Sequence, residues 1–429
     1  MRGLAVGSAP FTPPEMSLLR PPATPRLLWR QLPVHSPVPF GPAWEAVRHG
    51  LGLRDDPRPR VREMIRAAFG ADEAILLGSG TQALQVAIRA AARIVGDDPV
   101  VALPAFSCFD VASAAVGAGA RIALYDVEPS TLAPDLDSLA ATLAQGARIV
   151  VGVPLYGIPI EWQTMEERAR ACGAVVIEDA AQGHGAFWGD RPLGGVGVIT
   201  TLSFGRGKGW TGGKGGALLI RARGGRRLPL PSGGAGLPVA EAGAFAELGV
   251  LLRATAQWAL GHPSRYRLPA SIPWLGLGET RYHDPQPPTG MTRAAAALLE
   301  HTRALAAREA LARRANAEWL LDRLPASLHV RTVCPPAGSS PGYLRLPLRV
   351  SRGLPGFGDP SRAVQLGVMP SYPSTLAALP QVRARLAQGT GQWPGADELV
   401  RELVTLPTHS LVTKGDREAL ARLLADYVG

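Results

Sequence analysis

The sequence contains few lysines, few cysteines and no long apolar segment. Of its 45 basic residues, only Lys208, Lys214 and Lys414 are lysines, so chemistry that needs a lysine amine has three candidate positions. The three cysteines are far apart and lack the spacing of a zinc or iron–sulfur site. We therefore expect a reducing compartment and predict no metal site.

The chain also lacks a segment that could cross a membrane. Spanning a bilayer takes about 20 consecutive apolar residues, and the most apolar helical segment, residues 239–260, is interrupted by Glu241, Glu247 and Arg253. Prolines near the N-terminus interrupt any signal-peptide core. The prediction is a cytoplasmic protein without membrane association.

The net charge of +10 and the pI of about 10.1 raise the question of nucleic-acid binding. The basic residues are almost all arginines, and they are scattered along the chain. They come without interleaved aromatic residues or a recognisable reading motif. A general arginine bias explains this charge, and no nucleic-acid partner is predicted.

From residue 74 onward, short apolar segments alternate with helix-length segments. Seven of the apolar segments have the length and composition of strands: Ala74–Leu77, Val100–Leu103, Ile122–Tyr125, Ile149–Val153, Val175–Ile177, Val198–Leu202 and Ala217–Ile220. This alternation predicts an α/β fold with a mainly parallel seven-stranded sheet covered by helices on both faces. In such folds, ligands bind at the carboxyl ends of the strands.

Composition suggests three parts of the chain. Residues 1–45 are proline-rich and predict an arm that lies on another surface. Residues 46–290 are predicted to form the large α/β domain. Within it, residues 223–290 are predicted to be an insertion that is rich in glycine and proline and contains one helix, Glu241–Leu260. Residues 291–429 predict long connecting helices and a small C-terminal α+β domain.

A carboxylate and a lysine follow two successive strand segments. Glu178 and Asp179 end one apolar segment, and Lys208 follows residues 197–204. Pyridoxal phosphate (PLP) chemistry needs this pair, because a lysine forms a Schiff base with the cofactor aldehyde and a carboxylate keeps the pyridine nitrogen protonated. Side chains alternate along a strand, so we expect Asp179 to face the cofactor and Glu178 the opposite side. Taken alone, the acidic pair would equally fit a helix cap.

A turn of small residues, Gly78-Ser79-Gly80-Thr81, joins a strand segment to a helical one. Backbone N–H groups at the start of a helix bind anions, which makes this turn a candidate phosphate site. Its letters also fit a dinucleotide fingerprint, but the next strand ends in Leu103-Pro104-Ala105-Phe106, without the acid that would hold a ribose. A single phosphate is the better ligand, and a plain strand-to-helix turn remains the alternative.

The glycines around Lys208 and Lys214 invite comparison with an ATP-binding P-loop. Neither lysine has the required spacing from the first glycine, and neither is followed by Ser or Thr. An ATPase is therefore not predicted.

Taken in order, these motifs resemble those of the DegT/StrS family of PLP-dependent aminotransferases. The matching segments are S-G-T-Q-A-L from Ser79, P-A-F-S from Pro104, Y-D-V-E-P-S-T-L from Tyr125, P-L-Y-G from Pro154, I-E-D-A-A-Q-G-H-G from Ile177, S-F-G-R-G-K from Ser203 and L-V-T-L-P-T-H-S-L-V-T from Leu403. The resemblance implies a fold-type-I PLP enzyme, usually a homodimer. Such enzymes typically move an amino group from glutamate to a keto sugar attached to a nucleotide, in polysaccharide or secondary-metabolite biosynthesis.

The resemblance also implies roles for individual residues. Lys208 would be the Schiff-base lysine, because the S-F-x-x-x-K spacing selects it over Lys214, and Asp179 would be the partner of the pyridine nitrogen. Gln182 would lie near the phenolic oxygen of the cofactor. The cofactor phosphate would be held by Ser79, Gly80, Thr81 and Ser203.

The chain departs from the family pattern in three places. The aromatic residue that stacks on the cofactor ring falls at Cys108 here, with Phe106 and Phe109 close by. The family's N-Y-R segment is replaced by residues 288–291, and the insertion at 223–290 is longer than the usual connection. The last two departures lie where the family builds contacts to the substrate and to the partner subunit.

Two other functions stay open. Another PLP reaction on the same fold, such as epimerisation or dehydration, would use the same cofactor residues, although a related dehydratase group has histidine where this chain has Lys208. A non-catalytic relative, acting as a regulator or at a membrane, would account for the basic charge and for the apolar helix of residues 239–260. Such a protein has no need for Lys208 and Asp179 together.

Overall fold

The computed structural model describes residues 29–96, 98–222, 239–270, 280–387 and 391–427. Much of the predicted N-terminal arm (residues 1–28) and two parts of the predicted insertion (residues 223–238 and 271–279) lie outside the described residues.

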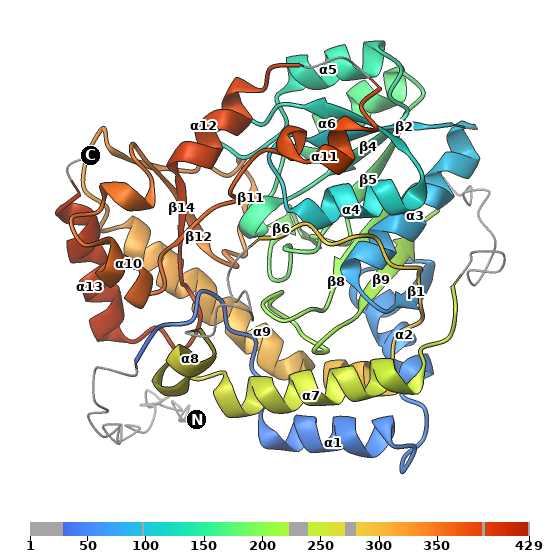
Figure 1. Ribbon diagram of the computed structural model, residues 1–429, viewed down its shortest axis with the longest axis horizontal. Helices are drawn as coiled ribbons and strands as arrows, with labels where there is room; N and C mark the ends of the chain where they lie inside the picture. The colour runs from blue at the N-terminus through green and yellow to red at the C-terminus, as the bar shows by residue number, and fades with distance from the viewer. Residues whose placement is uncertain (1–28, 97, 223–238, 271–279, 388–390, 428–429) are drawn as a thin grey trace, which may run out of the picture.

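A seven-stranded sheet forms the centre of the molecule, with the strand order β1-β9-β8-β5-β4-β2-β3 (Figure 1). Its strands are β1 (Glu73–Leu77), β2 (Val100–Pro104), β3 (Arg121–Tyr125), β4 (Ile149–Gly152), β5 (Val175–Asp179), β8 (Ile199–Ser203) and β9 (Gly216–Ile220). The strands from β3 to β8 run parallel, whereas β9 is antiparallel to both β8 and β1. The predicted strand segments and the mainly parallel sheet are therefore confirmed.

Helices cover both faces of this sheet because its strands are apolar on both sides. Along β2, Val101 and Leu103 pack in the core beneath α3 (Gly80–Val95) and α4 (Phe109–Ala118). Their neighbours Val100 and Ala102 pack in the core beneath α5 (Leu136–Ala144) and α6 (Trp162–Ala171) on the opposite face. This alternation follows from the two-residue repeat of a strand, and it leaves the strand ends as the place for polar groups.

A second group of helices covers the sheet near β1 and β9. It consists of α1 (Phe40–Gly50), α2 (Arg58–Ala68), α7 (Ala244–Leu260) and α9 (Arg293–Leu321). The short helix α8 (Pro263–Ala270) follows α7 and lies near α10 (Pro360–Gln365). The helix predicted in the insertion is confirmed as α7, which lies beside α1 (Figure 1). In α9, the Thr292 hydroxyl caps the first turn by accepting a hydrogen bond from the backbone N–H of Ala295 at 3.1 Å. Across the described ranges, every helix is too short or too polar to cross a membrane.

The C-terminal part is the predicted small α+β unit. Its antiparallel sheet has the order β10-β12-β14-β13, with β10 (Val330–Thr332), β12 (Leu346–Val350), β13 (Met369–Pro370) and β14 (Leu403–Leu406). Its helices are α10 (Pro360–Gln365), α11 (Pro380–Arg383), α12 (Pro394–Glu402) and α13 (Lys414–Ala425). A separate small sheet joins β11 (Ser339–Ser340) to β6 (Phe187–Trp188) and β7 (Arg191–Pro192).

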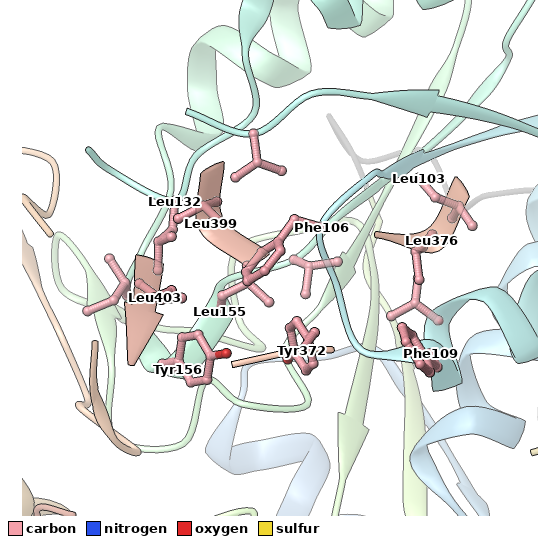
Figure 2. Close-up of a cluster of buried hydrophobic side chains, with 14 of the residues drawn as sticks. Leu103, Phe106, Phe109, Leu132, Leu155, Tyr156, Tyr372, Leu376, Leu399 and Leu403 are labelled. Atoms are coloured by element: carbon pink, nitrogen blue, oxygen red, sulfur yellow. The ribbon is translucent and has the colours of Figure 1, made fainter. Parts of the chain in front are cut away.

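The two sheets share one hydrophobic core. Phe106, which follows β2, packs against Tyr372 of the small unit with ring centroids 5.1 Å apart. Leu155, which follows β4, lies in the same cluster as Leu399 and Leu403 (Figure 2). Side chains of the small unit therefore lie close to the strand ends of the large sheet. Because this core is continuous, the division of the chain at residue 290 stays a prediction.

Candidate active site

A cavity with about 450 Å³ of empty space, part of it open to solvent, lies at the carboxyl ends of β5 and β8. The cavity is lined by Gly80, Thr81, Leu84, Cys108, Asp110, Val111, Val153, Asp179, Ala181, Gln182, Ser203 and Lys208. All of the predicted site residues except Ser79 are among them, although they come from the ends of four different strands and the segments that follow them.

Asp179 ends β5 with its carboxylate at the cavity wall. Its Oδ1 accepts hydrogen bonds from the Thr201 hydroxyl at 3.1 Å and from the backbone N–H of Ala181 at 3.2 Å. Among the described residues, nothing donates a hydrogen bond to Oδ2. Burial raises the pKa of the Asp179 carboxyl, and the nearby Lys208 charge acts in the opposite direction. The site therefore holds a fixed, desolvated carboxyl group that a bound cation would stabilise as the anion.

Glu178 points to the other side of the sheet, as the alternation of side chains predicts. Its carboxylate is fully buried and accepts hydrogen bonds from the backbone N–H groups of Gly194 at 2.6 Å, Val196 at 3.1 Å and Gly197 at 2.7 Å. The Thr200 hydroxyl donates a fourth at 3.0 Å. Glu178 therefore fixes the loop before β8 and takes no part in lining the cavity.

The two lysines of the glycine-rich segment lie in different environments. Lys208 lines the cavity together with Asp179. Lys214 is exposed and is absent from the cavity wall. The structure thus separates the two candidates in the way that the motif spacing predicts.

The turn before α3 brings backbone and side chain together at the cavity. A Cβ atom at Gly80 would lie 2.5 Å from the Cβ of Ser203, so only glycine allows the turn to approach the end of β8 this closely. In the described part of the chain, the N–H groups of Gly80 and Thr81 make no hydrogen bond, as expected for the first turn of a helix. With the Ser203 hydroxyl, they form an arrangement that can bind a phosphate.

Ser79 has a different position from the one expected for a phosphate ligand. Its hydroxyl caps α3 by accepting a hydrogen bond from the backbone N–H of Gln82 at 3.2 Å, and it does not line the cavity. A role of Ser79 in cofactor binding stays a prediction. The hydroxyl that would contact the phosphate is already used in capping α3.

Cys108, and not a phenylalanine, lines the cavity at the position of the expected stacking residue. Phe106 is fully buried against Tyr372, and Phe109 is buried in the core. Burial raises the pKa of the Cys108 thiol to about 11, so it stays protonated and acts as a small, nearly apolar group. Among the described lining residues none is aromatic, and the contact to a bound ring would come from Cys108 and aliphatic side chains.

Gln182 connects the cavity to two tyrosines that the sequence did not single out as site residues. Its Oε1 accepts a hydrogen bond from the backbone N–H of Tyr156 at 2.9 Å, and its Nε2 donates to the Tyr372 hydroxyl at 3.0 Å. The Tyr156 hydroxyl lies 2.6 Å from the Ser371 hydroxyl, and Figure 2 shows Tyr156 near Tyr372. Tyr156 has a φ of 56°, an unusual value for a residue with a side chain. In this backbone conformation, the Tyr156 N–H donates to Oε1 of Gln182.

Arg345 lies next to these tyrosines. Burial lowers the pKa of its guanidinium to about 10, and the nearby hydroxyls of Tyr156, Tyr266 and Tyr372 act in the opposite direction. One of its terminal nitrogens donates to the carbonyl oxygen of Thr405 at 3.1 Å, while its Nε is buried without a partner. No carboxylate of the described residues pairs with it. The Arg345 guanidinium, near the tyrosines that contact Gln182, therefore lacks a carboxylate partner among the described residues.

Residues 58–223 match the model of the DegT/DnrJ/EryC1/StrS aminotransferase family. The match covers less than half of the chain. The family is PLP-dependent. The matched segment contains the α3 turn, Asp179, Ser203 and Lys208, so the family match and the cavity depend on the same residues. Tyr372 and Arg345 lie outside it.

Curated members of the family match over part of their length. A 3-amino-5-hydroxybenzoate synthase from Amycolatopsis mediterranei is 31% identical over 197 residues, which are 43% of this chain and 50% of that protein. An L-glutamine:2-deoxy-scyllo-inosose aminotransferase from Streptomyces kanamyceticus is 35% identical over 141 residues, or 33% of each protein. The chain thus spans between a third and a half of these relatives.

The likeness in fold extends over nearly the whole chain. The sugar aminotransferase CalS13 from Micromonospora echinospora superposes with a TM-score of 0.69 at 21% identity, covering 92% of this chain and 99% of that one. At this identity the likeness shows the fold alone, and it confirms the predicted fold-type-I class.

The contact between Gln182 and Tyr372 can be tested by removing one hydroxyl. Tyr372→Phe would leave the Gln182 amide without its buried partner, so we expect the free energy of unfolding to fall by about 1–3 kcal/mol. Urea denaturation measures this change. Tyr343→Phe is the matched control, because Tyr343 is equally buried and its hydroxyl makes no hydrogen bond among the described residues. An equal loss in both variants would contradict a specific role for the Gln182 contact.

Proposed function

We propose that this protein is a PLP-dependent aminotransferase that transfers an amino group from an amino acid to a keto sugar. The observation that carries the proposal is the shared cavity of Lys208, Asp179 and the α3 turn. The match of residues 58–223 to an aminotransferase family supports the reaction class. A binding protein would not need a lysine and a buried carboxylate in one cavity.

The residues of the cavity fit PLP in three respects. The N–H groups of Gly80 and Thr81, with the Ser203 hydroxyl, would hold the phosphate. Asp179 would hold the protonated pyridine nitrogen. That positive charge would stabilise the ionised form of the desolvated Asp179 carboxyl group. Lys208 would hold the cofactor covalently. When bound, PLP supplies an aldehyde that captures amines and a ring that accepts the electron pair released when a C–H bond breaks.

Other steps of the reaction would depend on side chains of the cavity. The Lys208 amine, the only amine among the cavity-lining side chains described, would take a proton from the amine-bearing carbon and return one to the cofactor side. Asp179 would keep its negative charge next to the ring nitrogen. Leu84, Val111 and Val153 would limit the access of water.

The nature of the two substrates is supported by the names of relatives. One matched relative is named for L-glutamine as donor and an inosose as acceptor, and a structural neighbour is a sugar aminotransferase. We therefore infer glutamate or glutamine as the donor and a cyclic keto sugar, attached to a nucleotide, as the acceptor. The unpaired charge of Arg345 suits a donor that carries a carboxylate. A homodimer in polysaccharide or secondary-metabolite biosynthesis remains part of this proposal.

A transamination assay tests the proposal against other PLP reactions. The purified protein, supplied with PLP, should convert the amino donor into its 2-oxo acid beyond the amount of cofactor present only when a keto-sugar acceptor is added to receive the amino group. An epimerase or dehydratase would change the sugar without consuming the donor. Visible absorbance of bound cofactor without any such turnover would instead favour a regulatory relative.

Asp179→Asn tests the role of the buried carboxylate. Asparagine can keep the two hydrogen bonds to Oδ1 but carries no charge, so we expect kcat/KM to fall by about 10²–10³-fold, the size typical of losing one electrostatic stabilising group. Because burial raises the pKa of Asp179, the charged carboxylate destabilises the cofactor-free fold above that pKa. The cofactor-free variant should therefore melt no lower than wild type at neutral pH. A drop in both activity and melting temperature would point to a structural role instead.

A further inference from the structure

A second group of chemically active side chains lies where α1 packs against α9. Glu45 and His49 are four positions apart on α1, so their side chains lie on the same side of that helix. His301 reaches the same point from α9. One ligand atom of each residue lies within 4.8 Å of those of the other two. None of the three lines the cavity described above.

We propose that Glu45, His49 and His301 form a binding site for a divalent transition-metal ion, with Zn²⁺ the best fit. Two imidazole nitrogens and one carboxylate oxygen are typical zinc ligands, at distances of about 2.0–2.2 Å. Mg²⁺ and Ca²⁺ prefer sites made of oxygen alone, so the donor set selects against them. The sequence gives no sign of this site, because His301 is far from the other two ligands along the chain.

The environment of His49 prepares this ring for metal binding. Its Nδ1 lies 2.7 Å from the carbonyl oxygen of Asp55. A carbonyl oxygen can only accept, so Nδ1 carries the hydrogen and Nε2 keeps its lone pair. Metal-binding histidines are typically oriented by such a contact. The residue is 4% exposed, so its ring is held in place before any ion arrives.

The other two ligands can adjust to the ion. Glu45 accepts a hydrogen bond from Arg48 at 2.9 Å through Oε1, which leaves Oε2 for a metal. His301 is exposed, and its ring centroid lies 6.5 Å from that of His49. Ligands around a tetrahedral zinc are roughly 3.3 Å apart, given the usual bond lengths. Rotations of Glu45 and His301 would close the remaining gap, while the Arg48 charge opposes the ion and limits its affinity.

A bound ion would fasten α1 to the long helix α9. The three side chains leave a fourth position for water, and the exposed side of His301 provides the path of entry. Binding to the folded state alone raises stability in proportion to the logarithm of the ion concentration. The site would therefore act on the stability of this helix pair and leave the chemistry of the cavity unchanged.

Calorimetric titration of the full chain, without an affinity tag, with ZnCl₂ tests the proposal. We expect one ion per chain. His301→Ala should weaken binding by at least about 100-fold, since losing a direct ligand costs more than the 10–100-fold typical of an outer hydrogen-bond partner. His329→Ala is the control, because His329 is also exposed but is not one of the three clustered residues. Failure of wild type to bind, or equal binding by wild type and His301→Ala, would overturn the proposal.

Thermal unfolding gives a second readout that does not depend on activity. Zn²⁺ should raise the melting temperature of wild type and of His329→Ala, and a chelator should reverse the rise. His301→Ala should fold normally, because its side chain is exposed, and should show no rise. The same increase in all three proteins would contradict a site at Glu45, His49 and His301.

Discussion

Replacing Lys208 with alanine should abolish amino transfer and lower kcat/KM by at least about 10⁴-fold. General acid–base catalysis alone contributes about 10²–10⁴-fold, and this variant would also lose the covalent hold on the cofactor. The visible absorbance of the lysine-bound cofactor should disappear as well. The measurements are the transamination rate and the absorption spectrum of the protein supplied with PLP.

Lys214→Ala is the matched control for this variant. Lys214 belongs to the same glycine-rich segment but is exposed and outside the cavity. Its loss should leave both the spectrum and the rate close to those of wild type. If Lys208→Ala kept the absorbance, or if Lys214→Ala lost it, the assignment of the cofactor lysine would be wrong.

Replacing Glu178 with alanine should lower the free energy of unfolding by at least about 3–5 kcal/mol. Three backbone N–H groups and the Thr200 hydroxyl would lose their acceptor in a fully buried place, and each unsatisfied group costs about 1–3 kcal/mol. The Arg221 guanidinium, which donates to Thr200 at 3.0 Å, would also lose a nearby negative charge. Denaturation in urea, monitored by circular dichroism, gives the change.

Glu167→Ala provides the comparison for this stability effect. Glu167 is exposed on α6, and its carboxylate accepts one hydrogen bond from Gln163. Surface changes of this kind usually alter stability by less than about 0.5 kcal/mol. A loss for Glu178→Ala no larger than that for Glu167→Ala would mean that the loop before β8 does not depend on the buried carboxylate.

The large sheet could be predicted from the sequence because its physical signal is local. Strands buried on both faces, such as β2, are apolar at every position, and the helices between them have their own length and period. The pairing of Asp179 with Lys208 was also predictable, because the carboxyl ends of neighbouring parallel strands meet at one edge.

The side of the site formed by the small unit could not be predicted in the same way. Tyr372 reaches Gln182 only because the two sheets share a core, and no local pattern in the sequence marks that contact. Strand β13 is two residues long and contains Pro370, which argues against a strand when read alone. Ser79 shows another limit, since a serine before a helix can cap it or bind a phosphate, and the letters are the same for both.

The shared core around Phe106 and Tyr372 also restricts how this protein can change over evolution. Domains joined by a linker can be exchanged between genes as intact modules, because few contacts cross the boundary. Here the aromatic and leucine side chains of both sheets fill one interior, so a foreign C-terminal unit would have to reproduce their shapes as well as the fold. The contact between the two units is therefore more easily changed by point substitutions near Phe106 and Tyr372 than by recombination.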